Sequence, residues 1–463
     1  MLARMNAAPH GYEIDVPEDG RRRLAVGWLA LGIAALAGSG VFAILLVLAR
    51  APYVKDLFPT SDFFRTALVV HVDLSVLVWF AACGGVLWTL NSTPRALWLG
   101  TGALVLAAAG TLLMCAAPFL GYPLPVMSNY VPVLHDRWFL TGLMVFGGAC
   151  AALVLRSMWA APRVGVRLDG GGALRFGLNS AAVSAALACI AFAWSWLKLP
   201  PGLEPKAYYE VLFWGGGHVL QFTWTLLMLV AWLWLAEAIG AELPLTPRVA
   251  TLFFGVGLVS VFATPVIYLA WDVVSMQHYR YLTWIMRFGG GLAILPFVLA
   301  LGLALARLGE VTPAQRPLRA ALLCSMALFG AGGLLGFAIE GSDVRIPAHY
   351  HGCIVGVTLA MMGLVYALLP KLGFGAPPPR AAALQAWLYG AGQLLHVAGL
   401  AWSGGYGVQR KAAGAEQALR TLPEIAAMGM MGLGGLLAVA GGLMFVVIAI
   451  SSMKGSMRGA PRS

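Results

Sequence analysis

Apolar and polar residues in this chain are arranged in long blocks rather than in short alternations. Runs of about 20 or more mostly apolar residues recur from one end of the chain to the other, with short polar segments between them. A helix of that length crosses about 30 Å of hydrocarbon, because it rises about 1.5 Å per residue. The pattern therefore predicts an all-α membrane protein with twelve transmembrane helices, beginning near Leu24, Ala67, Leu97, Trp138, Phe176, Val211, Val249, Leu282, Leu318, Ile346, Ala383 and Ala426.

The composition supports this class. The chain is 60% hydrophobic and 11% charged, and its mean hydropathy is +0.82, which excludes an ordinary soluble domain. No internal repeat, long linker or low-complexity segment divides it. We therefore expect one integral membrane domain over residues 1–463. It comprises a cytoplasmic leader at 1–23, a twelve-helix bundle at 24–455 and a cytoplasmic tail at 456–463.

Charge and cysteine usage indicate the orientation of the chain, its surroundings and the way a haem could be attached. The leader has no small-residue cleavage site, and the cluster of Arg21, Arg22 and Arg23 predicts a cytoplasmic N-terminus. The net charge of +11 is spread over short loops, which favours contact with anionic membrane lipid over nucleic-acid binding. The six cysteines include no C-x-x-C-H motif, so no covalently attached haem is expected.

Five histidines fall near the outer face when the twelve spans alternate from a cytoplasmic N-terminus. They are His71, His218, His278, His349 and His351, with His278 placed after the end of the seventh span. Histidine is costly in hydrocarbon and marks a functional site there. A single histidine in a span is more often a packing residue, but five at one depth indicate a redox metal centre.

The His-x-His pair on the tenth span limits how these ligands combine. Positions i and i+2 of a helix are about 200° apart, so His349 and His351 cannot share one metal. Each could ligate a different haem. His71 could complete a low-spin haem with one of them, leaving the other haem open to a small gas. His218 and His278 could then hold a further metal, since imidazole suits copper and iron alike.

This order of histidines resembles the catalytic subunit of the haem–copper oxidase superfamily, which includes cytochrome oxidases and bacterial nitric oxide reductases. The resemblance covers nearly the whole chain and is strongest in FWGGGHVLQF and SDVRIPAHYHGCIVGVTLAMMGLVYALLPKLG. It implies that His71 and His351 ligate a low-spin haem, His349 a high-spin haem, and His218 and His278 a distal copper or non-haem iron. The ligands do not distinguish haem types, and two b-type haems are the expectation.

The resemblance also implies a setting and partners. Arg410 and Lys411, before the last span, resemble a basic pair that contacts haem propionates. The protein is expected in the bacterial cytoplasmic membrane as a multi-pass subunit. Its electrons would come from a partner subunit on the outer face, bearing cytochrome c or copper, or from quinol.

The chain departs from the family pattern at the distal metal. The family has two adjacent histidines after the seventh span, whereas this chain has Gln277 and His278. The tyrosine positions of the oxygen-reducing members are occupied by Phe222 and Trp271, and the nearest tyrosine is Tyr268. A glutamine oxygen suits iron better than copper. These departures favour the reduction of nitric oxide to nitrous oxide.

Two alternatives stay open. The first is a cytochrome c oxidase that reduces dioxygen, with Tyr268 as a displaced redox tyrosine. Ser260, Thr264 and Tyr268 repeat every four residues and form either a proton path or interhelical hydrogen bonds. The second alternative is a non-catalytic haem scaffold or gas sensor that has lost its distal metal, which Gln277 would explain.

Overall fold

A computed structural model describes residues 11–48, 61–121, 123–165, 168–339, 343–408 and 421–455. Their contacts divide the chain into two compact units. Unit 1 comprises Met1–Phe42 and Pro59–Gly309, and unit 2 comprises Ala43–Phe58 and Glu310–Ser463. We describe each unit separately, and the expectation of a single domain stays a prediction.

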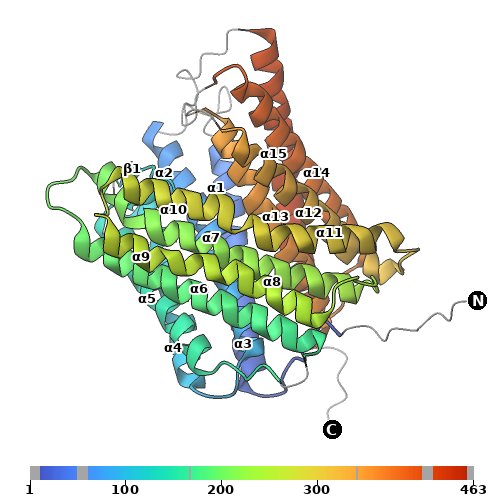
Figure 1. The fold of residues 1–463 in the computed structure, drawn as a ribbon. Coiled ribbons are helices and arrows are strands. Elements are labelled where there is room, and N and C mark those ends of the chain that lie inside the picture. Colours follow the sequence, from blue (N-terminus) through green and yellow to red (C-terminus); the bar gives the residue numbers. More distant parts are fainter. Residues whose placement is uncertain are drawn as a thin grey trace, which may run out of the picture. The chain divides into compact units, whose positions relative to one another are not determined.

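Unit 1 contains most of the helices and a small hairpin (Figure 1). In chain order its elements are α1 (Gly20–Leu48, which extends into unit 2), α2 (Ser61–Val72), η2 (Asp73–Val78), α3 (Trp79–Asn91), α4 (Leu97–Ala116), η3 (Ala117–Phe119), β1 (Leu124–Val126), β2 (Val133–His135), α5 (Arg137–Trp159), α6 (Gly170–Lys198), α7 (Pro205–Ala238), α8 (Pro247–Val259), η4 (Ser260–Phe262), α9 (Ala263–Ala270), α10 (Met276–Gly289) and α11 (Gly291–Arg307).

Unit 2 is built from four long helices after a short helical turn. Its elements are η5 (Pro313–Gln315), α12 (Arg316–Phe337), α13 (Arg345–Lys371), α14 (Pro379–Gly404) and α15 (Leu422–Gly455).

The helices occupy the twelve predicted places, so the all-α membrane class is confirmed. Three predicted spans are composite, since α2 continues through η2 into α3, α8 through η4 into α9, and α10 into α11. Within the described residues, eleven spans are long and apolar enough to cross a membrane. The remaining predicted span is the 26-residue helix α14, whose hydropathy is lowered by Gln385, Gln393 and His396.

Two local features differ from the sequence prediction. The segment before α5 forms an antiparallel hairpin, in which β1 pairs with β2. His278 lies in the first turn of α10, because this helix begins at Met276 rather than near Leu282. Ser275 caps the helix, since its side chain accepts a hydrogen bond from the His278 backbone N–H. A polar N-cap of this kind starts the helix earlier than the apolar run alone indicates.

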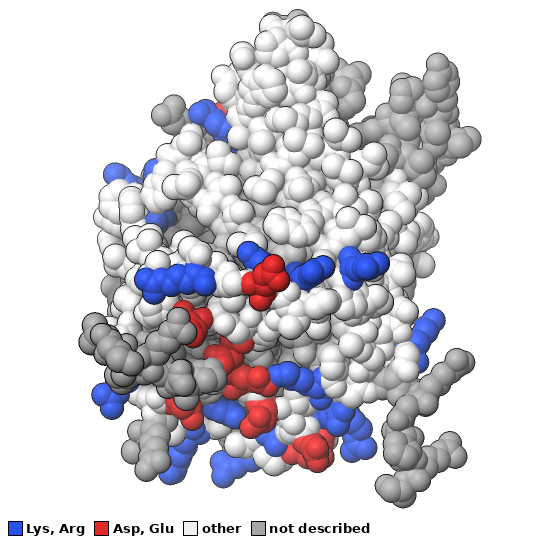
Figure 2. Space-filling model, turned by 90° about the vertical axis from the view of Figure 1, so that its right-hand side faces the viewer, with Lys and Arg blue, Asp and Glu red and all other residues white. Residues whose placement is uncertain are grey.

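The surface has the character of a lipid-facing protein. Large apolar side chains are widely exposed on the helices, among them Trp98 at 73% and Leu269 at 76%. On the face shown in Figure 2, most Lys, Arg, Asp and Glu side chains gather in its lower half, and broad areas carry no charge. Extensive apolar exposure would be unusual for a soluble protein, so it supports the multi-pass membrane class.

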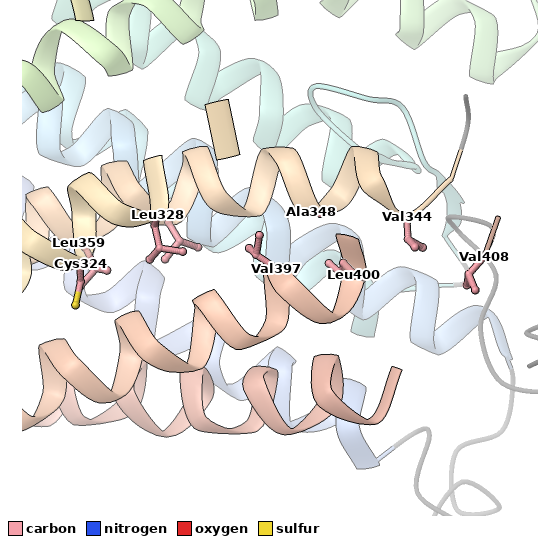
Figure 3. Packing of buried hydrophobic residues seen from close by; sticks show 9 residues of the cluster. Cys324, Leu328, Val344, Ala348, Leu359, Val397, Leu400 and Val408 are labelled. Carbon is pink, nitrogen blue, oxygen red and sulfur yellow. The ribbon is translucent and has the colours of Figure 1, made fainter. Parts of the chain in front are cut away.

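One helix forms the centre of each unit. In unit 1, α7 is buried along most of its length and packs against α6 and α10. In unit 2, α13 holds the same position between α12 and α14. A helix that is apolar on all sides is expected to be buried in this way. Figure 3 shows the apolar cluster between α13 and its neighbours, formed by Cys324, Leu328, Val344, Ala348, Val355, Leu359, Val397, Leu400 and Val408.

Glycines set the close packing of α12 on α13. A Cβ at Gly332 would lie 2.5 Å from the Cys353 backbone N and 2.8 Å from the His349 carbonyl oxygen. Small residues at such points let two membrane helices approach closely.

We expect Gly332→Ala to destabilise the protein by about 1–3 kcal/mol, because the added methyl group meets backbone atoms that cannot move aside. Thermal unfolding in detergent measures the effect. Gly330→Ala is the matched control, since its Cβ would have no neighbour within 4 Å. Equal melting temperatures for the two variants would contradict the prediction.

Candidate haem and metal site

His71 lies at the end of α2, where the helix passes into a π-helical turn. Its Nδ1 lies 2.9 Å from the carbonyl oxygen of Ser39 on α1, and the Ser75 hydroxyl donates to the His71 carbonyl. The Ser39 hydroxyl is also 2.9 Å from Nδ1. In the tautomer that donates Nδ1–H to the Ser39 carbonyl, Nε2 keeps a lone pair for a metal. The π-helical turn begins at Asp73, whose carboxylate is buried and whose Oδ2 has no hydrogen bond within the described residues. Such turns occur frequently at functional sites.

His218 is held at the centre of α7 in the same tautomer. Its Nδ1 lies 2.7 Å from the Trp214 carbonyl oxygen, and its ring contacts Trp214 at 4.7 Å between centroids. Tyr130, in the turn of the β1–β2 hairpin, contacts the His218 ring at 4.9 Å between centroids and also meets the Trp214 ring edge-on. Gly217 makes room for Tyr130, because a Cβ there would overlap the phenol ring. The hairpin thereby fixes the orientation of His218.

His278 is the most isolated of the five histidines. His278 is 1% exposed, and within the described residues neither its Nδ1 nor its Nε2 has a hydrogen-bond partner. A buried polar group without a partner costs about 1–3 kcal/mol. A metal bound to one of these nitrogens would remove part of that cost. His278 and His218 come from the neighbouring helices α10 and α7.

Tyr268 lies beside both of these helices. Its ring meets the His278 ring edge-on, with centroids 4.6 Å apart, and its hydroxyl is 2.8 Å from the Ser195 hydroxyl on α6. It also packs on Gly215, three residues before His218, where a Cβ would come within 2.8 Å of the phenol Cζ. The glycine therefore leaves room for a phenol between the His218 helix and the His278 ring.

Ser260 and Thr264, the other two hydroxyl residues of the four-residue repeat, differ in their hydrogen bonding. Ser260 donates an interhelical hydrogen bond to the Gly289 carbonyl, and Thr264 is buried without a partner within the described residues. The helix is also tightened at η4, which interrupts the four-residue repeat. Interhelical bonding thus explains Ser260, while a proton path through Thr264 stays a prediction.

Gln277, Phe222 and Trp271 occupy three positions at which this chain departs from the family pattern, and each has surroundings other than the His278 ring. Gln277 is exposed although His278 is buried, because successive helical residues are about 100° apart. Phe222 is packed in an apolar cluster with Val219 and Val261. The Trp271 ring contacts Tyr281, with centroids 4.4 Å apart.

His349 and His351 contact different helices, as their angular separation predicts. The Nδ1 of His349 lies 2.7 Å from the Gly332 carbonyl oxygen on α12. The Nδ1 of His351 lies 2.8 Å from the Pro347 carbonyl oxygen, and its ring meets His396 on α14. Both rings are partly exposed. Their tautomers leave Nε2 as the ligating atom.

An ion pair lies at the start of α13. Arg345 and Asp343 are 2.7 Å apart, and the guanidinium lowers the pKa of the Asp343 carboxyl below its usual value. Arg410 and Lys411, predicted to contact haem propionates, lie outside the described residues. Their role stays a prediction.

These residues fit haem and metal ligation. Four of the five histidines donate Nδ1–H to a backbone carbonyl, which is the arrangement usual for metal-ligating imidazoles. The fifth, His278, has unsatisfied buried nitrogens. Within the described residues, no group of three His, Cys, Asp or Glu side chains is assembled for a metal.

Sequence reasoning missed Tyr130 and the contact between His351 and His396. The hairpin that carries Tyr130 has strands of only three residues, too short to be recognised by alternation. The depth of His396 on its span was visible in the sequence, but its partner was not.

Comparisons with known proteins agree with the resemblance found in the sequence. The family model described as cytochrome c and quinol oxidase polypeptide I matches residues 23–443. An uncharacterized protein of Rickettsia prowazekii, RP382, is 30% identical over 93% of this chain and 96% of its own length. Cytochrome c oxidase subunit 1 of Thermus thermophilus is 26% identical over 84% of this chain and 76% of its own.

Solved structures give the same fold. A heme-copper terminal oxidase dimer, determined by cryo-electron microscopy, superposes with a TM-score of 0.69. The match covers 96% of this chain and 85% of the other chain at 14% sequence identity. At that identity the likeness concerns the fold alone.

Proposed function

The chain belongs to the cytochrome c and quinol oxidase polypeptide I family, and we propose that it is the catalytic subunit of a respiratory reductase that converts nitric oxide to nitrous oxide. Family membership makes it a multi-pass membrane oxidoreductase. The substrate and the individual ligands are our proposal.

In this proposal, His71 and His351 hold a low-spin haem, and His349 holds a high-spin haem. His218 and His278 hold the distal metal. The pairing of His71 with His351 rests on their resemblance to the family ligands. Bound haems and metal would supply electron transfer and a binding place for the gas. The chain's own contribution is to fix His71, His218, His349 and His351 through Nδ1 and to exclude water around His218 and His278, which are 3% and 1% exposed.

The observation that carries the choice of nitric oxide is the environment of Phe222. This residue is one turn after His218, where common oxygen-reducing members have a tyrosine, and it is 6% exposed among apolar side chains. A phenyl ring cannot supply the electron and proton that O–O cleavage needs. Two nitric oxide molecules require no such cleavage, because they take two electrons and two protons to give nitrous oxide and water.

A second candidate function is the reduction of dioxygen to water. The observation that favours it is Tyr268, whose phenol contacts the His278 ring and packs beside the helix of His218. In that case Tyr268 would be the redox tyrosine, and its hydroxyl proton would be shared with Ser195. The exposed position of Gln277 also weakens the argument for an oxygen ligand and iron.

Purified protein, reduced by an artificial donor, should form nitrous oxide from nitric oxide and consume dioxygen slowly. We expect Tyr268→Phe to retain most of the nitric oxide activity, because the phenol hydroxyl has no part in that reaction. Gas-selective electrodes measure both substrates, and metal analysis is run on the same sample. Fast four-electron dioxygen consumption that Tyr268→Phe abolishes, with negligible nitrous oxide, would overturn the proposal in favour of the second candidate.

A further inference from the structure

His396 stands out among the histidines that the proposed function does not use. It lies on α14, and its ring is 4.9 Å from the ring of His351, centroid to centroid, with 50° between the planes. The two imidazoles are therefore in contact within unit 2. In this arrangement His396 limits the rotation of the His351 ring.

The structure holds His396 in one orientation. Its Nδ1 lies 2.9 Å from the carbonyl oxygen of Met431 on α15. Glycines make this possible: a Cβ at Gly392 or Gly399 would collide with the α15 backbone at 2.5–2.9 Å, so both helices approach closely there. Gly435 on α15 lies against the His396 ring. A Cβ at this position would touch only His396, 3.3 Å from its Nδ1 and 3.7 Å from its Cε1.

The hydrogen bond also fixes the chemistry of the ring. The Met431 carbonyl can only accept, so Nδ1 carries the proton and Nε2 presents a lone pair. An apolar cluster lies between these helices, with Val397 and Leu400 on α14 and Met428 and Met431 on α15. In such a low-dielectric environment a fixed dipole acts more strongly than in water. The Nδ1–H end of this imidazole dipole points at α15, so its electron-rich Nε2 end points away from that helix. Such a dipole on a ring that contacts an axial ligand favours the more positively charged, oxidised iron.

We propose that His396 is a positioning residue for the low-spin haem, which sets the ring plane of His351 and lowers the midpoint potential of the iron that His351 ligates. This inference rests on the proposed role of His351. It assigns to His396 a function that a merely packed histidine would not have, because packing alone depends on the shape of the ring and not on its nitrogens. Haem potential is commonly tuned by such neighbours of the axial ligand.

His396→Phe tests this in the full-length purified protein, because phenylalanine keeps an aromatic ring and removes both nitrogens. We expect the ratio of ferrous to ferric low-spin haem to rise about three- to tenfold at fixed potential. A tenfold change corresponds to about 59 mV for one electron. Redox titration followed by optical spectroscopy measures the shift. The electron paramagnetic resonance signal of the ferric low-spin haem should also change, because it reports the orientation of the axial rings.

Gly435→Ala is a second, milder probe that leaves His396 in place. Its methyl group would press on the His396 ring and on no other side chain, so it should alter the low-spin resonance signal while haem content stays the same. Gly432→Ala is the matched control on α15, since a Cβ there has nothing within 4 Å, and it should leave the signal unchanged.

The outcomes separate this inference from the function on which it rests. If the wild type binds two haems and both His396→Phe and Gly435→Ala keep the wild-type potential and resonance signal, the inference is wrong and the proposed function stands. If the wild type has no low-spin haem, or keeps it in His351→Ala, both proposals fail. Should His396→Phe not assemble, Gly435→Ala against Gly432→Ala decides alone.

Discussion

Replacing His351 with alanine should abolish the low-spin haem spectrum and leave carbon monoxide binding intact, whereas replacing His349 should do the opposite. The two residues are two positions apart on α13, yet the ring of His349 lies against α12 and the ring of His351 against α14. One helix can therefore ligate two different haems on two sides. In the proposed arrangement, a change at either position would remove one iron–nitrogen bond and leave the other in place.

The effect of each change should be close to complete for its own haem, because alanine has no side-chain nitrogen that could bind a metal, and the neighbouring His396 is held by its hydrogen bond to the Met431 carbonyl on α15. Reduced-minus-oxidised spectra report the low-spin haem, and the carbon monoxide difference spectrum reports the high-spin haem. His71→Ala should reproduce the His351→Ala spectrum.

His135→Ala is a suitable control for these variants. His135 is an exposed histidine on β2, and its Nδ1 lies 3.0 Å from the Tyr209 hydroxyl. The His135→Ala variant should leave both spectra unchanged. Loss of carbon monoxide binding in His351→Ala, with a normal low-spin spectrum in the same sample, would reverse the assignment of the two ligands.

The membrane class could be predicted from sequence, and candidate ligands could be proposed, because both depend on local pattern. Apolar runs of membrane-spanning length define the helices, and the position of a histidine along its run defines its depth. The angular separation of His349 and His351 follows from helix geometry alone, and the contacts of their rings confirm it.

The features that local pattern could not predict depend on contacts distant in sequence. Tyr268 reaches the His218 helix because Gly215 leaves space, and Tyr130 reaches His218 because of Gly217. Each contact joins residues more than 50 positions apart. The exposure of Gln277 depends on where α10 begins, which a capping serine decides and the apolar run does not.

The distal metal is the point on which the reductase and the non-catalytic scaffold differ most, and His278→Leu separates them by the sign of its effect on stability. If His218 and His278 hold a metal, the change should remove it and lower gas turnover by at least about 100-fold, since even indirect partners of metal ligands cost 10–100-fold. The melting temperature should then fall, because the bound metal no longer stabilises the folded protein.

If no metal binds there, the opposite is expected. His278 would then be a buried imidazole whose two nitrogens have no partner within the described residues, at a cost of about 1–3 kcal/mol. Leucine removes that cost and fills a similar volume, so the melting temperature should rise while haem content stays the same. Metal analysis of the wild type, with differential scanning calorimetry of wild type and His278→Leu, gives both readings. A third metal in the wild type together with a more stable variant would contradict ligation by His278 and leave the metal on other residues.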